Sequence, residues 1–234
     1  MEIRRLSLAE GVRSATGLTV IIDVIRSFSS EPLMAQLGAK RILLEGDVEK
    51  CFARRGDALL VGSRNEVPIE GFDLTNSPWR ILQAGPDLFR GRAVIHRSTS
   101  GVGGALAALA RTEEVLLASF LNARATAEYI RHHNPAVVSL VAMGSRASLP
   151  APEDERCADY LAHLLTGTPY DHVAALAEIL AHPNARKYLD ADNPALPKED
   201  IVLCLQRDVV DFALLARRRG DEVEAVPVRV GQDS

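Results

Sequence analysis

The sequence has little of what marks secreted, membrane-spanning or nucleic-acid-binding proteins. It has only three cysteines, at positions 51, 157 and 204, and neither their number nor their spacing fits a disulfide framework or a metal site. Its first residues lack the apolar core of a signal peptide, and no apolar run approaches the ~20 residues that a membrane helix needs. We therefore expect a reduced, cytoplasmic protein without a membrane partner.

The sequence also lacks an excess of basic residues. Lys and Arg number 27 and Asp and Glu number 31, so the formal net charge is −4, with both signs mixed along the chain. A general nucleic-acid binder needs a basic face, so we expect no nucleic-acid partner. The 234 residues, 47% of them hydrophobic, are enough for a sizeable core in one large domain or two small ones.

Short apolar runs alternate with helical patterns along most of the chain. Strands are predicted at residues 18–22, 41–44, 58–61, 92–95, 114–117, 136–141 and 222–228. Helices are predicted at residues 31–37, 48–54, 77–84, 105–109, 122–131, 153–165, 173–181, 184–189 and 198–215. The alternation indicates a three-layer α/β/α fold with a largely parallel or mixed sheet, a helical C-terminal region and a terminal strand. We expect a single domain over 1–234, with two interlocked lobes at about 1–145 and 146–234 as the alternative.

The stretch 71–78 is the most concentrated polar turn. It places a carboxylate (Asp73), a carboxamide (Asn76) and two hydroxyls between a predicted strand and a predicted helix. Ser77 before Pro78 is typical of a helix N-cap followed by proline at the first helical position. A helix N-terminus suits a phosphate or carboxylate, because its backbone N–H groups are free and its dipole is positive. A polar loop that only caps the helix is the alternative.

Polar turns follow other predicted strands as well. Their candidate site residues are Asp23, Arg26, Arg64, Arg97, Ser100, Gly101, Asn122 and Arg146. Guanidinium groups bind phosphate and sulfonate oxygens through paired hydrogen bonds, and α/β sheets bind ligands outside the carboxyl ends of their strands. For each single residue a helix cap or a surface salt bridge is the alternative; Asn122 is also a candidate N-cap.

Four carboxylates are candidates for a hard divalent cation, namely Asp23, Asp73, Glu153 and Asp154. Mg²⁺ takes oxygen ligands and often needs only one or two protein carboxylates beside substrate oxygens and waters. His96, at a strand end, is a candidate general acid or base or a structural histidine. Cys157 is expected to be a buried small hydrophobe rather than a nucleophile.

Several pieces of the chain, in order, resemble the 2-phosphosulfolactate phosphatase family over roughly residues 15 to 230. They are Val20–Arg26, Gly71–Pro78, Ala118–Ala123 and Glu153–Asp154 with Cys157–Ala158. The resemblance implies a three-layer α/β fold and Mg²⁺-dependent hydrolysis of a phosphate monoester on a sulfonated hydroxy acid, which belongs to coenzyme M biosynthesis in some organisms. The expected partner is a small anionic phosphate or sulfonate metabolite. Whether the chain forms a homodimer is left undecided by the sequence.

The expected reaction gives each candidate residue a role. Catalytic roles are expected for Asp23, Arg26, Asp73 and Arg64. Phosphate or substrate binding is expected for Asn76, Ser77, Arg97, Ser100, Gly101 and Asn122. Metal binding is expected for Asp23, Asp73, Glu153 and Asp154. In this hypothesis Mg²⁺ clamps the phosphoryl oxygens, Arg26 and Arg64 with the backbone at Ser100 and Gly101 neutralise developing charge, and water attacks phosphorus. A phosphorylated aspartate is left open.

The chain departs from the family pattern at several positions. Ser63 stands where the family usually has an acid, and Thr75 where it has a glycine. Ser98–Val102, preceded by Arg97, stands where it typically reads Thr-Thr-Asn-Gly-Thr. A lost acid and a gained arginine make an anion site more positive, which weakens a divalent cation. The alternative function is therefore a catalytically weak paralogue that binds a phosphorylated or sulfonated metabolite.

Overall fold

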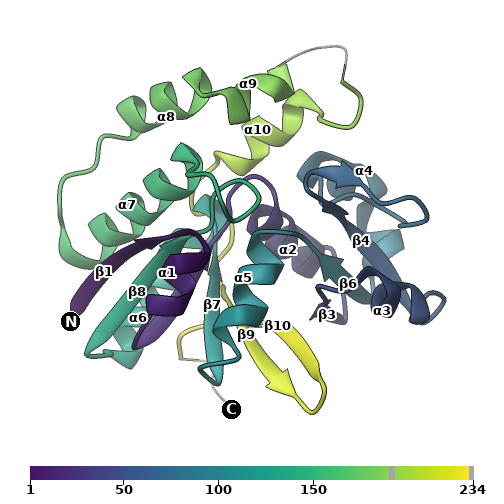
Figure 1. Cartoon of the computed structure of the whole chain (residues 1–234), viewed down its shortest axis with the longest axis horizontal. Helices are drawn as coiled ribbons and strands as arrows, with labels where there is room; N and C mark the ends of the chain where they lie inside the picture. The colour runs from purple at the N-terminus through teal and green to yellow at the C-terminus, as the bar shows by residue number, and fades with distance from the viewer. Residues whose placement is uncertain (190–192, 232–234) are drawn as a thin grey trace.

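The computed structural model describes residues 1–189 and 193–231, which form a ten-stranded mixed sheet flanked by helices (Figure 1). The predicted α/β class is confirmed. The strands are β1 (Glu2–Ser7), β2 (Leu18–Ile22), β3 (Arg41–Leu44), β4 (Ala58–Arg64), β5 (Val67–Pro68), β6 (Ala93–Arg97), β7 (Glu114–Ala118), β8 (Val137–Ala142), β9 (Ala213–Arg219) and β10 (Glu222–Val228). Residues 190–192 and 232–234 of the predicted 1–234 domain lie outside this description.

The helices supply the outer layers. They are α1 (Leu8–Ser14), α2 (Ser27–Gln36), α3 (Val48–Ala53), α4 (Pro78–Phe89), α5 (Gly101–Ala108), α6 (Ala123–His133), α7 (Pro152–Thr166), α8 (His172–Ala181), α9 (Pro183–Leu189) and α10 (Lys198–Cys204), with a 3₁₀ turn, η1 (Phe120–Asn122). One core packs α1, α2, α4 and α5 on the sheet, and a second packs α6 to α10 on it. Strand β2 contributes Ile21 to the first core and Val20 and Ile22 to the second, because successive side chains point to opposite faces.

The sheet order is β1-β8-β2-β7-β9-β10-β3-β6-β4-β5. Strands β1, β8, β2 and β7 are parallel to their neighbours in one group, and β3, β6 and β4 form a second parallel group. The antiparallel hairpin of β9 and β10 joins the two groups by pairing with β7 and β3. The C-terminal strands therefore lie in the middle of a sheet that the N-terminal residues begin.

The largest error of the sequence prediction is the helix expected over residues 198–215. Helix α10 ends at Cys204, and Ala213 begins strand β9. The run from Ala213 to Ala216 is buried on both faces between β7 and β10, and such a run carries no period that separates strand from helix. Strand β1 and helix α1 had no prediction, and α2 begins at Ser27, four positions before the expected Glu31.

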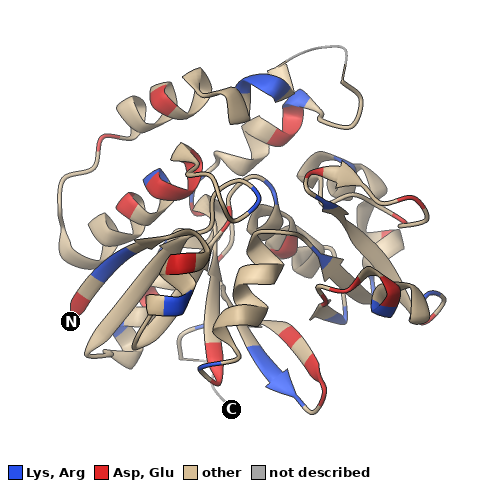
Figure 2. Ribbon diagram, viewed as in Figure 1, with Lys and Arg blue, Asp and Glu red and all other residues tan. Residues whose placement is uncertain are grey.

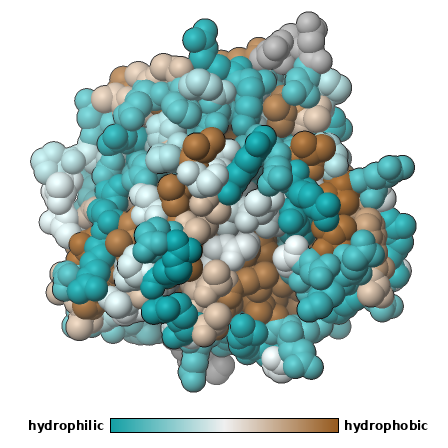
Figure 3. Space-filling view, in the orientation of Figure 1, coloured by the Kyte–Doolittle hydropathy of each residue, from teal (hydrophilic) through white to brown (hydrophobic). Residues whose placement is uncertain are grey.

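The surface mixes both charge signs and carries an apolar groove. Acidic and basic residues alternate over both halves of the ribbon (Figure 2). Apolar side chains gather between α5 and β10 (Figure 3) in a groove lined in part by Leu43, Leu44, Ile95, Leu106 and Val223. Among the described residues, no helix has the length and apolarity to cross a bilayer.

Candidate active site

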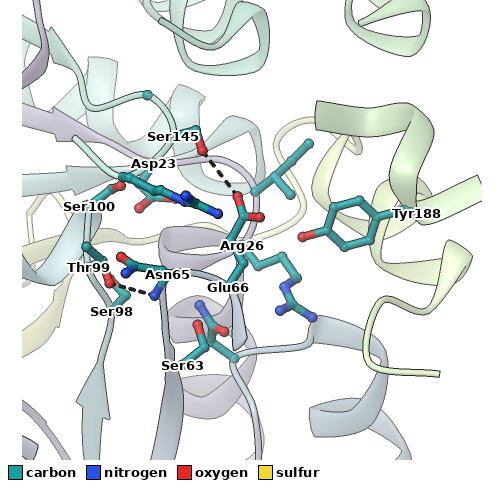
Figure 4. Close-up of a pocket in the computed structure, with 14 residues that line it drawn as sticks. Asp23, Arg26, Ser63, Asn65, Glu66, Ser98, Thr99, Ser100, Ser145 and Tyr188 are labelled. Carbon is teal, nitrogen blue, oxygen red and sulfur yellow. Dashed lines mark hydrogen bonds between the residues drawn. The ribbon is translucent and has the colours of Figure 1, made fainter. Parts of the chain in front are cut away.

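A polar pocket lies where four strands of the two parallel groups end. The turns after β2, β4, β6 and β8, together with α9, supply its walls (Figure 4). Its lining residues are Asp23, Ile25, Arg26, Ser63, Asn65, Glu66, Asn76, Ser98, Thr99, Ser100, Gly144, Ser145, Arg146 and Tyr188. The cavity volume that a water-sized sphere can occupy is ≈ 40 Å³, within ≈ 400 Å³ of space that extends to the open mouth, so the pocket in this structure is small and polar.

Asp23 follows β2 directly and is 6% exposed. Its carboxylate accepts a hydrogen bond from the backbone N–H of Ser27 at 3.3 Å, at the start of α2. A Cβ on Gly101 would lie 2.7 Å from Asp23 Oδ2, so glycine lets the start of α5 approach the carboxylate. Burial raises the pKa of Asp23 to about 6, although backbone N–H groups of Ser27 and Gly101 act in the opposite direction. Asp23 is therefore a buried acid that titrates near neutral pH.

Arg26 lies in the same turn with a side chain that is 2% exposed. Its Nη1 donates to Asp200 Oδ2 at 3.0 Å, and its guanidinium lies 5.5 Å from the ring centre of Tyr188. Its buried Nη2 has no hydrogen-bond partner among the described residues. A buried N–H donor without a partner is costly, so a ligand oxygen that accepts from Nη2 would be favoured here.

Asp200 holds several parts of this region together. Its buried carboxylate accepts from Arg26 and also from Ser77 Oγ at 2.7 Å and the backbone N–H of Trp79 at 3.0 Å. These contacts join α10 to the turn after β2 and to the start of α4. Asp200 therefore fixes the direction of the Arg26 guanidinium through Nη1 and makes no bond to Nη2.

Glu153 and Asp154 lie in the first turn of α7, and both are buried. Asp154 accepts from the backbone N–H groups of Val24 and Gly144, at 2.7 Å each, so it fixes the turns after β2 and β8. Burial and the neighbouring Asp23 hold its pKa well above the usual range. Burial, and secondarily Asp23, raise the pKa of Glu153 to about 7, and its Oε2 has no partner in the described structure.

Five of the predicted site residues line the pocket: Asp23, Arg26, Asn76, Ser100 and Arg146. Asn76 is 4% exposed, and its Oδ1 has no partner within the described residues. Ser100 accepts a hydrogen bond from the backbone N–H of Ala147 at 3.0 Å, which joins the start of α5 to the loop after β8. Gly101 lies beside Asp23 without lining the pocket itself.

Asp73 and Ser77 lie outside the pocket lining. Asp73 is exposed, and its carboxylate accepts from the backbone N–H of Leu60 at 2.8 Å, so it ties this stretch to β4. The predicted N-cap at Ser77 is confirmed, because its Oγ accepts from the backbone N–H of Arg80 at 3.3 Å and Pro78 begins the helix. The structure thus does not bring Asp73 together with the buried acids Asp23, Glu153 and Asp154.

Three further predicted residues also lie outside the lining. Arg64 is exposed at the end of β4. Arg97 donates to the carbonyl oxygens of Ser63 at 2.6 Å and Gly46 at 3.3 Å, and burial with the nearby Arg64 lowers its pKa. Asn122 forms a capping box with Ser119, and its Nδ2 donates to the carbonyl of Leu117. Each of these side chains has a local structural contact or faces solvent.

His96 and Cys157 are core residues. His96 is fully buried, and its Nδ1 lies 2.5 Å from Oε1 of Glu31, so it joins β6 to α2. Cys157 is fully buried in α7, and burial holds its pKa well above the usual range. Both residues are therefore structural. For His96 this was one of two predicted roles, and for Cys157 it was the expected one.

Sequence reasoning missed Glu66, Tyr188, Lys187 and Asp200. Glu66 sits in a two-residue turn between β4 and β5, and the asparagine before it was a local sign of such a hairpin. Tyr188 and Asp200 reach the site only through packing of the C-terminal helices, so no local pattern marks them. Ser145 precedes the candidate Arg146 in the turn after β8 and was not itself predicted.

Comparisons with known proteins agree with the resemblance. A sequence model of the family described as 2-phosphosulpholactate phosphatase matches residues 6–218. A protein of Bacillus subtilis named "Probable 2-phosphosulfolactate phosphatase" is 33% identical, over 87% of this chain and 89% of its own length. A Thermus thermophilus protein of the same name is 30% identical, over 92% of this chain and 90% of its own length. The chain belongs to the 2-phosphosulfolactate phosphatase family.

Mg²⁺ is the cofactor that membership of the 2-phosphosulfolactate phosphatase family led us to expect, and the buried acids can be tested against it. Among the residues that the structure describes, no group of three or more His, Cys, Asp or Glu side chains is arranged to hold a metal ion. Mg²⁺ often uses only one or two carboxylates, however, and Asp23 and Glu153 are neighbouring oxygen donors with raised pKa values. The partnerless Oε2 of Glu153 adds to this fit, whereas Asp73 lies elsewhere.

Proposed function

We propose that this protein hydrolyses 2-phosphosulfolactate to sulfolactate and phosphate at the pocket around Asp23 and Arg26. The observation that carries the proposal is a polar pocket lined by a buried acid, Asp23, and by a buried guanidinium, that of Arg26, whose Nη2 has no hydrogen-bond partner among the described residues. Family membership supplies the substrate class, since the relatives are named as phosphatases of this ester.

The roles of the chain's own groups follow from their positions. Arg26 Nη2 would donate to a phosphoryl oxygen and stabilise the charge that builds there in the transition state. The N-terminus of α5 at Ser100 adds a positive dipole end on the same side as Asp23. Asp23 and Glu153 would hold Mg²⁺, which when bound neutralises phosphoryl oxygens and orients the ester. Water as the attacking group, a cytoplasmic location and a link to coenzyme M stay predictions.

A second candidate function is an anion-binding paralogue with weak turnover. One observation favours it: Ser63, which replaces the acid usual in the family, is 4% exposed and lines the pocket. A pocket that loses an acid holds a divalent cation less strongly. Arg97, the other departure cited for this function, directs its guanidinium to backbone carbonyls and does not line the pocket.

Phosphate release from 2-phosphosulfolactate, measured with Mg²⁺, with EDTA, and with Mg²⁺ restored, tests the proposal. We expect hydrolysis that EDTA abolishes and Mg²⁺ restores. Full activity in a metal-free preparation would remove Mg²⁺ from the mechanism. Binding of phosphate or sulfolactate by calorimetry without any turnover would favour the anion-binding paralogue.

A further inference from the structure

A carboxylate of the chain itself occupies an anion-binding position at the pocket. Glu66 lines the pocket, and its Oε2 lies 2.6 Å from Nζ of Lys187. Its Oε1 accepts a hydrogen bond from Ser145 Oγ at 3.3 Å (Figure 4). A cation from α9 and a hydroxyl from the turn after β8 thus converge on one acid, which is how a protein binds a ligand carboxylate or sulfonate.

The backbone holds Glu66 in this position at some strain. Asn65 and Glu66 form the two-residue turn between β4 and β5, with φ values of +50° and +69°. Glycine or asparagine is usual at such left-handed positions, and glutamate is unusual there. The turn is fixed to the next strand end, because the backbone N–H of Asn65 donates to Thr99 Oγ1 at 2.9 Å. A strained backbone that presents one side chain to a pocket favours a functional role for it.

Lys187 is placed by one face of α9. Asn184, Lys187 and Tyr188 are spaced by three and four residues, so they share a face of the helix. Asn184 contacts Glu153 at 3.5 Å, Lys187 contacts Glu66, and Tyr188 lies over Arg26. The same face therefore reaches the buried acids, the mouth of the pocket and its guanidinium.

We propose that Lys187 and Ser145 bind the sulfonate of the substrate, and that the Glu66 carboxylate binds to these two residues in its place when no substrate is present. This inference rests on the proposed function, in which the phosphate lies at Arg26. In 2-phosphosulfolactate the carboxylate is attached to the carbon that carries the phosphate ester, and the sulfonate is one carbon farther away. The more distant acid group is the one that reaches Lys187, where it exchanges with the Glu66 carboxylate.

A pair of esters that differ only in the sulfonate tests the assignment. The ratio of kcat/KM for 2-phosphosulfolactate to that for 2-phospholactate is measured for the full chain and for Lys187→Met. We expect this ratio to fall about tenfold, as loss of a partly exposed charged hydrogen bond predicts. Arg186→Met is the matched control, because Arg186 is an exposed cation next in sequence on the same helix, and it should keep the ratio.

Two kinetic outcomes would overturn the assignment. One is an unchanged ratio in Lys187→Met. The other is a fall of the ratio in Arg146→Met but not in Lys187→Met, since Arg146 is a second cation of the pocket lining. Because Lys187 and Glu66 are both about one-third exposed, these variants should fold, and thermal melting checks that they do.

Calorimetry with sulfolactate separates this inference from the proposed function, because it requires no turnover. Lys187→Met should bind sulfolactate about tenfold more weakly than the unchanged chain. Glu66→Gln should bind it several-fold more tightly, because the competing carboxylate is gone. If no ester is hydrolysed but these binding changes occur, the phosphatase proposal fails and the sulfonate site stands. Equal sulfolactate affinity in all three proteins, or weaker binding in Glu66→Gln, would overturn the site.

Discussion

Two turns of this protein have nearly the same chemistry and different positions. The turn from Asp23 to Ser30 and the stretch 71–78 both combine an aspartate with several hydroxyls at the start of a helix. The first follows a central strand directly, and burial raises the pKa of Asp23 to about 6. The second runs parallel to β4, with Leu74 bridged to Val61, and there Asp73 is exposed. Position against the sheet, rather than composition, separates the two aspartates.

The difference is not complete, because the end of the second stretch does reach the site. Asn76 lines the pocket, and Ser77 donates to Asp200, which holds Arg26. The residues at the start of α4 therefore support the pocket, while Asp73 ties the stretch to β4.

Replacing each of the two aspartates in turn should give the largest difference in kcat between the two turns. We expect Asp23→Asn to lower kcat for 2-phosphosulfolactate on the order of 10³-fold, because a group at the reacting phosphate is lost. Asp73→Asn keeps an acceptor for the N–H of Leu60 and should change kcat less than about threefold. Phosphate-release kinetics with Mg²⁺ measure both. A large loss of kcat in folded Asp73→Asn, with little loss of kcat in Asp23→Asn, would assign the catalytic role to the stretch 71–78 instead.

Asp200→Asn should give the next largest effect, on stability as well as activity. Removing one charge of the buried pair with Arg26 leaves the other uncompensated, so we expect about 3 kcal/mol less stability. For a chain of this size the melting temperature should fall by about 10 °C. Asp73→Asn, unfolded by heat under the same conditions, is the control. A melting temperature within about 2 °C of the unchanged chain would show that the pair is not a structural hub.

The sequence was sufficient for the α/β class and for most strands, because buried β-branched runs and capped helices are local signals. It was insufficient for β9, whose apolar run has no distinguishing period, and for β1, which has mixed exposure along its length. It identified Asp23, Arg26, Asn76, Ser100 and Arg146 as site candidates from polar turns.

The rest of the site depends on long-range packing. Asp200 lies 174 positions from Arg26 in the sequence, and Lys187 lies 121 positions from Glu66. No local pattern reports such contacts. Conversely, Asp73 has the residue type and the sequence neighbours of a catalytic acid, and only the parallel contact of its stretch with β4 places it elsewhere.

Ser77→Ala sharpens the comparison at the end of the second stretch. The substitution removes an N-cap and one donor to Asp200, and we expect about 1–2 kcal/mol of lost stability. Ser77→Thr keeps the hydroxyl and should recover most of it. Denaturant unfolding of the three proteins measures the difference, and equal loss in both variants would mean that packing, not the hydroxyl, matters.

The smallest expected effect is a pH dependence that comes from the buried acids. The pKa values of Asp23 and Glu153 are raised to about 6 and about 7, so the folded chain keeps these protons to a higher pH than the unfolded chain does. Stability from this source is fully present below the unfolded pKa values and is lost as pH rises through 6 and 7. Melting curves in EDTA from pH 5 to pH 8 should show this fall. Glu153→Gln should reduce its slope, and an unchanged slope would contradict the assignment.

A crystal structure with phosphate and Mg²⁺ tests the central claim most directly, because it shows which of the two turns receives the anion. We predict phosphate in the pocket beside Asp23, with an oxygen within hydrogen-bond distance of Arg26 Nη2. Phosphate bound in the stretch 71–78 beside Asp73, with the pocket around Asp23 free of it, would contradict the account.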